Sequence, residues 1–365
     1  MLAAEAQKTR LIFFLTLCLC VSVAKHLELV VPSFDFREGA AIPNLHKMQC
    51  VRRAVIDVGT NSVKLLVAEV SGGDVQPVHE ESRQTRLGQG FYESHKLQPE
   101  SIARTAAAVA EFRDIARKQG ALAIRVIATS AARDAVNAGD LTAAIGRASG
   151  LATEIISGEC EANWAFQGAA TDPELRQWPL LLLDVGGGST EFILGRGQTT
   201  HFAHSFPLGT VRLMETFPHG DPPAAEEFNA CRGWLRSFLA REVRPLVEPA
   251  LTKENGDIQL VGTGGTTTIL ARMERKLDSF DRETIEKTVL SFDRVVAQRQ
   301  RLWQLPQAQR RQITGLPQNR ADVILTGALI YEMVMEEFGF RQLRVSTRGL
   351  RFAAVMEPAT DEQLL

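Results

Sequence analysis

The stretch from Leu180 to Gly195 reads LLLLDVGGGSTEFILG, an apolar run that ends at Asp184 and continues into three glycines, Ser189, Thr190 and Glu191. The apolar run predicts a buried strand, and the glycines predict a tight turn into a second strand. A carboxylate and several backbone N–H groups would then meet at one place, which suits a magnesium ion with its phosphates. Taken alone, the glycines are more typical of an ordinary β-turn.

The same pattern occurs once earlier in the chain. Residues 53–70, RAVIDVGTNSVKLLVAEV, again combine two apolar runs with a turn, and the DVG of this segment begins at Asp57, 127 positions before the DVG that begins at Asp184. Ser62 and Ser189 match at the same offset. A tandem duplication of one α/β unit explains both the repeat and its spacing.

Around the two hairpins, predicted strands and helices alternate. Residues 51–170 are expected to run β-β-β-α-β-α-β-α, and residues 171–357 to repeat this order. In the second half we expect helices at about 226–248 and 321–338, and a charge-rich helical insertion at about 274–319. We therefore expect an α/β fold in which two duplicated domains, 51–170 and 171–357, face a central cleft. Residues 1–50 are expected to form a disordered extension, and 358–365 a C-terminal tail.

The composition is that of an ordinary globular chain, with 45% hydrophobic and 23% charged residues. A formal net charge of -2 argues against a broad electrostatic surface for duplex nucleic acid, so any polyanion must be held by selected basic residues and metal. The five cysteines form no CxxC pair, which indicates neither a disulfide framework nor a zinc site.

The first fifty residues carry an ambiguous signal. Lys8 and Arg10 precede an apolar run at 11–24 that is typical of a signal peptide and too short for a comfortable membrane span. Because nothing downstream looks secreted, we expect a cytoplasmic protein without stable membrane association. Export, a start codon assigned too early with translation beginning near Met48, and a disordered appendage are the competing interpretations.

The two hairpins and a third glycine-rich turn carry the candidate chemistry. Asp57 and Asp184 are candidate magnesium ligands, because Mg²⁺ takes one or two carboxylates together with substrate oxygens, although either residue alone would be typical of a turn cap. The third turn, GTGGT, opens a predicted helix whose N-terminus suits an anion or is simply a tight connection. No Walker A or Rossmann pattern is present. The candidate phosphate-binding residues are Gly59, Thr60, Asn61, Ser62, Gly186, Gly187, Gly188, Ser189, Thr190, Gly264, Gly265 and Thr266.

Six motifs together resemble the exopolyphosphatase and guanosine pentaphosphate phosphohydrolase family. They are DVGTNS (57–62), TSAARDA (129–135), IISGECEA (155–162), DVGGGSTE (184–191), GTGGT (262–266) and RVSTRGLR (344–351). The resemblance covers about residues 54–354 and is closest to the short, two-domain form. It implies ribonuclease H-like domains of the actin, sugar kinase and heat-shock ATPase superfamily.

The resemblance also implies roles for individual residues. Glu161 would be the catalytic base, although its position near the start of a predicted helix is otherwise typical of a residue that stabilises the helix dipole. Arg133 would contact a phosphate with help from Asn137, and Glu191 would position the metal or its water with Asp184. Weaker cleft candidates are Lys64, Arg86 and Arg320. Cys160 and Thr347 depart from residues frequent in the family, which leaves the substrate preference open.

These features predict a Mg²⁺-dependent phosphohydrolase. It would release the terminal phosphate of inorganic polyphosphate, of guanosine pentaphosphate, or of both, by attack of a water activated by Glu161. The alternatives are an ATP-dependent small-molecule kinase of the same superfamily and a non-catalytic nucleotide-binding regulator. The oligomeric state is open, with a homodimer as one candidate.

Overall fold

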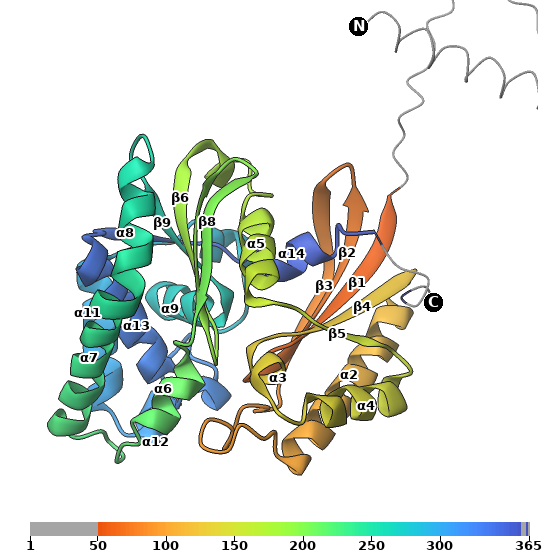
Figure 1. Cartoon of the computed structure of the whole chain (residues 1–365), viewed down its shortest axis with the longest axis horizontal. Coiled ribbons are helices and arrows are strands. Elements are labelled where there is room, and N and C mark those ends of the chain that lie inside the picture. The colour runs from red at the N-terminus through yellow and green to blue at the C-terminus, as the bar shows by residue number, and fades with distance from the viewer. Residues whose placement is uncertain (1–49, 359–362, 364–365) are drawn as a thin grey trace, which may run out of the picture. The chain divides into compact units, whose positions relative to one another are not determined.

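The computed structural model describes residues 50–358 and 363, which belong to one compact unit built on two β-sheets. The first sheet has the strand order β3-β2-β1-β4-β5 (Figure 1). Its strands are β1 (Val51–Val58), β2 (Ser62–Ser71), β3 (Asp74–Gln84), β4 (Ala123–Ala128) and β5 (Thr153–Ile155). The first three strands are antiparallel and β4 and β5 pair in parallel, as expected for hairpins followed by helical crossovers.

The second sheet repeats this plan and adds one edge strand, giving the order β10-β11-β9-β6-β7-β8. Its strands are β6 (Pro179–Val185), β7 (Thr190–Arg196), β8 (Thr199–Phe206), β9 (Gln259–Thr263), β10 (Val289–Ser291) and β11 (Gln342–Val345). The order β8-β7-β6-β9-β11 corresponds position by position to the order of the first sheet. The predicted duplicated α/β fold is therefore confirmed.

Helices cover the sheets. In the first half they are α2 (Pro99–Lys118), α3 (Ser130–Asp134), α4 (Ala138–Ser149) and α5 (Gly158–Ala169). In the second half they are α6 (Thr210–Thr216), α7 (Ala225–Phe238), α8 (Arg244–Lys253), α9 (Gly264–Arg275), α10 (Arg282–Glu286), α11 (Phe292–Gln304), α12 (Gln307–Arg310), α13 (Ile324–Phe338) and α14 (Leu350–Ala354).

Two helices, α5 and α14, lie between the sheets and join the halves (Figure 1). One hydrophobic cluster contains residues of both sheets and both helices, including Val55, Phe166, Leu182 and Phe352. A Cβ on Gly168 would collide with the backbone of Gly349, so a glycine is needed where the two helices cross. This shared core fixes the start of α5 near the ends of both central strands.

Three elements differ from the sequence expectation. The helix expected at about 226–248 is longer and is interrupted by a π-helical turn at Leu239–Val243, just before Pro245. The helical insertion expected at 274–319 also contains β10, which pairs with β11. A three-residue strand is too short to show a period of two, and its partner is distant in the sequence. The helix expected from residue 321 begins at Ile324.

In the part of the chain that the structure describes, no helix combines the length and hydrophobicity needed to cross a membrane. The signal-like run at 11–24 lies outside the described residues. The domain boundaries at 50, 170 and 357 stay predictions.

Candidate active site

The two duplicated hairpins have the same backbone geometry at their tips. The N–H of Gly59 donates to the carbonyl of Ser62 over 3.0 Å, and the N–H of Gly186 donates to that of Ser189 over 2.9 Å. In the strand pairing, Asp57 lies opposite Lys64, and Asp184 lies opposite Glu191. Each hairpin therefore presents an Asp at the end of its first strand and a second charged side chain directly across from it.

Both hairpin tips line one cavity between the two halves, together with the start of α5, the start of α9 and the segment before α13. Of the residues predicted from the sequence, this cavity is lined by Asp57, Gly59, Thr60, Asn61, Ser62, Lys64, Glu161, Asp184, Gly186, Gly187, Gly188, Ser189, Glu191, Gly265, Thr266 and Arg320. Residues up to 263 positions apart in the chain, Asp57 and Arg320, thus meet at one place.

Glu161 reaches the cavity from the first turns of α5. Ser157 caps this helix by accepting a hydrogen bond from the N–H of Cys160 over 3.1 Å, which fixes where the helix begins. The Glu161 side chain is buried, with 7% residue exposure, and its Oε2 accepts a hydrogen bond from Nη1 of Arg133 over 2.8 Å. The carboxylate is therefore held in one orientation by a charged donor.

Glu191, on β7, is the second buried glutamate of the cavity, with 1% exposure. Its Oε1 accepts a hydrogen bond from the hydroxyl of Ser205 on the neighbouring strand over 2.7 Å. Glu161 and Glu191 interact electrostatically across the cavity, so each makes it harder for the other to ionise.

Burial raises the pKa of all four acidic groups of the cavity. It raises the pKa of Glu161 to about 7, although the Arg133 guanidinium opposes the shift. It raises the pKa of Glu191 well above its ordinary value, and the charges of Glu161 and Asp184 add to the effect. The pKa values of Asp57 and Asp184 are raised by the same burial, against the attraction of Lys64. Four carboxyl groups in so small a space call for a cation or for protons.

The residues of the cavity fit a hydrated divalent cation. Oδ1 of Asp57 is buried and accepts no hydrogen bond from any residue that the structure describes, so it is available as a ligand. No group of three or more His, Cys, Asp and Glu side chains placed to hold a metal occurs within residues 50–358 and 363. Two carboxylates with water and substrate oxygens form the kind of site that Mg²⁺ uses, whereas zinc is usually held by three or four protein ligands.

Several predicted residues lie beside the cavity and not in it. Arg133 touches it only through Glu161, and the Thr190 hydroxyl already donates to the carbonyl of Leu208. Gly264 has φ +86° and packs against Asp184 so closely that a Cβ would collide with its carboxylate. Arg86 pairs with Asp322, and Asn137 bonds the backbone of Leu97. The side chains of these two residues therefore bind other parts of the fold, although the N–H of Arg86 donates to the carbonyl of Asn61, which lines the cavity.

Three hydroxyl groups near the hairpins were not among the predicted site residues. The Ser130 hydroxyl lines the cavity and is buried without a hydrogen-bond partner among the described residues, and the Tyr92 hydroxyl lies beside Gly188. Thr210, at the start of α6, lines the same cavity. Ser130 stands at the strand-to-helix turn of TSAARDA, a position that the repeat indicates, whereas Tyr92 lies in a loop whose path the sequence does not predict.

Comparisons with known proteins agree with this geometry. The model of the Ppx/GppA phosphatase family matches residues 66–359. Exopolyphosphatase 2 of Mycobacterium tuberculosis is 35% identical over 318 residues, covering 83% of this chain and 97% of that protein. Exopolyphosphatase 1 of Mycobacterium bovis is 28% identical, with 86% of this chain and 89% of that protein covered.

Solved structures show the same fold. A Ppx/GppA family member from Aquifex aeolicus is 30% identical, with a TM-score of 0.69 over 84% of this chain and 97% of its own. An exopolyphosphatase from Cytophaga hutchinsonii is 26% identical, with a TM-score of 0.74 over 83% and 96%. The chain belongs to the Ppx/GppA phosphatase family, and its two halves have the actin-like ATPase fold.

Proposed function

We propose that this phosphatase releases the terminal phosphate of inorganic polyphosphate in a divalent-cation-dependent reaction, with Glu161 as the general base. The names of its relatives from Mycobacterium and Cytophaga support the substrate. The observation that carries the mechanism is the position of Glu161, a buried carboxylate held by Arg133 between two Asp-bearing hairpins. A base of this kind needs a pKa close to the working pH, and burial of Glu161 provides one.

In the proposed reaction, the terminal phosphoryl group lies between the two hairpin tips. Glu161 accepts a proton from a water as the water oxygen forms a bond to phosphorus. The bond from phosphorus to the bridging oxygen breaks on the opposite side, and its electron pair stays with the shortened chain. The products are orthophosphate and a polyphosphate one unit shorter. Arg133 holds Glu161 in place, and the Ser130 hydroxyl is available to bond a phosphoryl oxygen.

Asp57 and Asp184 would hold the cation, and Glu191 would orient one of its waters. When bound, the cation neutralises charge on the phosphoryl oxygens. Lys64 and Arg320 line the same cavity and would contact the phosphates of the leaving chain. The lining of the catalytic cavity is thus cationic at Lys64 and Arg320, while Glu161 and Glu191 form an acidic wall.

Guanosine pentaphosphate is the second candidate substrate, and one feature favours it. A neighbouring cavity of about 390 Å³ shares Lys64, Gly265, Ile269 and Arg320 with the catalytic cavity. The half-exposed ring of Phe280 lines this second cavity. An aromatic face beside a phosphate site suits a nucleobase.

The direct test is phosphate release by the purified chain, with Mg²⁺, from long-chain polyphosphate, guanosine pentaphosphate and ATP. We expect release from polyphosphate and a loss of about 10²-fold to 10⁴-fold in kcat for Glu161→Gln, with substrate binding retained. Cys160→Ala, one position away on the same helix, is the matched control and should keep near wild-type activity.

Wild-type activity in Glu161→Gln would disprove the mechanism. Phosphate transfer from ATP to a small acceptor would favour the kinase alternative, and binding of nucleotide without turnover would favour the regulator.

A further inference from the structure

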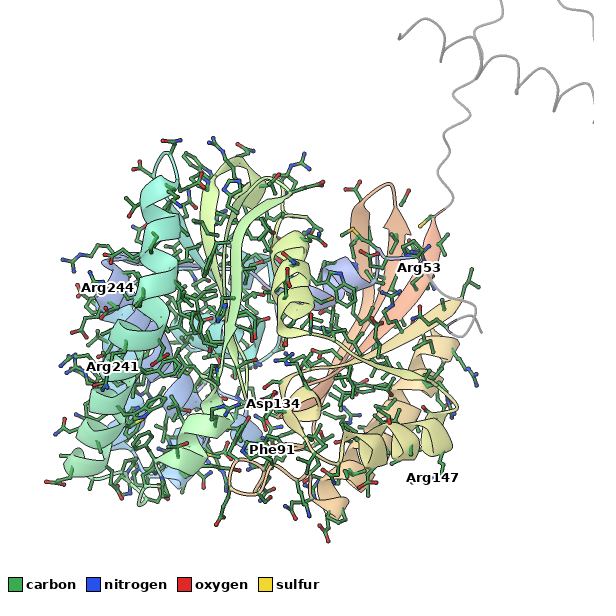
Figure 2. The ribbon with its side chains drawn as sticks, viewed as in Figure 1. Arg53, Phe91, Asp134, Arg147, Arg241 and Arg244 are labelled. Atoms are coloured by element: carbon green, nitrogen blue, oxygen red, sulfur yellow. The ribbon has the colours of Figure 1, made fainter. Side chains whose placement is uncertain are left out.

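A second chamber adjoins the catalytic cavity and has no role in the mechanism above. It has a volume of about 400 Å³ and is called the side chamber here. It lies where α3, the start of α5, β8 and the start of α6 meet, and Asp134, which lines it, faces the second half of the molecule (Figure 2). Its lining consists of Ser130, Arg133, Asp134, Gly158, Glu159, Ser189, Ala203, His204, Ser205, Phe206, Pro207 and Arg212.

The side chamber touches the acidic wall of the catalytic cavity. Ser130 and Ser189 line both spaces. Arg133 lines the side chamber and holds Glu161, and Ser205 lines it and holds Glu191. Both glutamates of the catalytic cavity are therefore tethered by residues of the side chamber.

Two features bear on the exchange of an anion between the two spaces. A Cβ on Gly158 would lie 2.8 Å from the Cβ of Ser205, so a glycine at this position keeps the side chamber open beside Ser205. The Ser130 hydroxyl, in a residue only 3% exposed, has no partner among the described residues, so it can donate to an anion on either side.

The charges of the side chamber suit a small oxyanion that binds weakly. Nε of Arg212 donates to the carbonyl of Gly188 over 2.8 Å, and its Nη2 donates to Asp134 over 3.2 Å. The other terminal nitrogen, Nη1, takes part in neither bond and can donate to an anion. The exposed carboxylate of Glu159 lies in the same lining and opposes Arg133 and Arg212. Such a balance favours transient occupation by an anion.

The stereochemistry of the proposed hydrolysis explains why a second anion site would be useful. The leaving chain and the attacking water lie on opposite sides of phosphorus. In the proposed reaction the chain would extend toward Lys64 and Arg320, which also line the Phe280 cavity, so the new orthophosphate would form on the side of Glu161 and Glu191. As long as the shortened chain stays bound, orthophosphate cannot leave the way the substrate entered.

We propose that the side chamber is an orthophosphate site, through which the product leaves while the shortened polyphosphate remains bound. This inference rests on the proposed phosphohydrolase function. Arg133 and Ser130 would pass the anion from the catalytic cavity, and Arg212 would receive it. The chamber thereby allows successive phosphates to be removed from one bound chain.

The test uses a matched set of charge variants, Arg212→Gln and Glu159→Gln in the side chamber and Arg236→Gln on the exposed face of α7. Orthophosphate should inhibit polyphosphate hydrolysis noncompetitively, because it binds with the chain in place. Arg212→Gln should weaken this inhibition about tenfold, since a charged hydrogen-bond donor is lost. Glu159→Gln should strengthen it about threefold, since a repelling charge is lost. Arg236→Gln should change nothing.

Rapid-quench and phosphate-sensor measurements separate chemistry from release. Glu159→Gln should form enzyme-bound orthophosphate at the wild-type rate and release it more slowly. Purely competitive inhibition, or equal effects of Arg212→Gln and Arg236→Gln, would overturn the proposal.

A calorimetric titration of orthophosphate into the Glu161→Gln protein with polyphosphate bound tests the site without turnover. Binding that is weakened by adding Arg212→Gln supports the chamber site, and no binding refutes it. If the wild-type protein fails to hydrolyse polyphosphate, the proposed function is wrong, and a titration of orthophosphate into the wild-type protein alone still decides whether the chamber binds anions.

Discussion

The two hairpins of this protein are copies in backbone and opposites in charge. Position for position, Asp57 corresponds to Asp184, and Lys64 corresponds to Glu191, because both pairs lie 127 positions apart and face each other in the same register. The first hairpin can therefore balance its own charge with an ammonium group. The second hairpin instead carries two acidic residues, Asp184 and Glu191, and α5 adds a third, Glu161, to the same cavity.

The same asymmetry holds at the tips. Thr60 corresponds to Gly187, and a Cβ on Gly187 would lie 2.9 Å from the Cβ of Thr60. One copy supplies a side chain and the other supplies the space that receives it. The two copies of the duplicated unit thus form one cavity whose sides differ: the first hairpin contributes Lys64, and the second hairpin contributes Glu191.

The largest expected effect comes from removing one Asp in each hairpin. Asp184→Asn should lower cation-dependent hydrolysis on the order of 10³-fold, because the residue opposite Asp184 is Glu191, which cannot replace the positive charge of a lost cation. Asp57→Asn should cost only about tenfold, since Lys64 remains opposite the altered residue. Activity measured across a Mg²⁺ titration checks this, with Cys160→Ala as the control. Equal losses in the two Asn variants would show that the hairpins are equivalent.

The next effect concerns Lys64, the residue that distinguishes the first hairpin. Lys64→Met should raise the KM for polyphosphate about tenfold or more and lower kcat much less, since the ammonium contacts the chain and not the attacking water. Steady-state kinetics on short and long chains measures the split. A fall in kcat with unchanged KM would instead place Lys64 at the reacting phosphorus.

A smaller effect is a shift in pH dependence through Glu191. The base must be ionised, so hydrolysis should fall as the pH drops through the raised pKa of Glu161, about 7 in the protein without cation. Glu191→Gln removes a like charge, so the acidic limb should move to lower pH by about one unit. Higher Mg²⁺ should move the limb in the same direction. The pH profile of kcat/KM is the measurement, and an unmoved limb in Glu191→Gln would show that the two glutamates are uncoupled.

Repetition in the sequence predicted the main features of fold and site. The repeated DVG and the strand patterns gave the duplicated α/β fold, and the two Asp residues were predicted to meet because they end matching strands. Glu161 could be predicted as the catalytic base only from the family motif, because a glutamate near the start of a helix is also explained by its interaction with the helix dipole. The structure brings Asp57, Asp184 and Glu161 together in one cavity, and their catalytic and metal-binding roles stay predictions.

Other features depend on contacts between distant segments. The strand β10 has only three residues, and the residues it pairs with lie 51 to 55 positions away. The sequence shows that Lys64 and Glu191 have opposite charges at matching positions. Only the strand pairing shows that each of them lies directly across from an Asp. The side chamber combines residues of four elements, none of which indicates a cavity by itself.

The smallest expected effect concerns the fit between the two tips. Gly187→Thr should destabilise the protein by about 1 to 3 kcal/mol, because its side chain would occupy the space already filled by Thr60. Thr60→Gly should also destabilise, by leaving that space empty. The exchange variant, Thr60→Gly with Gly187→Thr, returns a threonine to the same gap from the opposite hairpin. It should therefore recover about 1 kcal/mol relative to the sum of the single changes in urea unfolding. Additive losses would mean that the tips do not interlock, and that the duplicated loops contribute to the site independently.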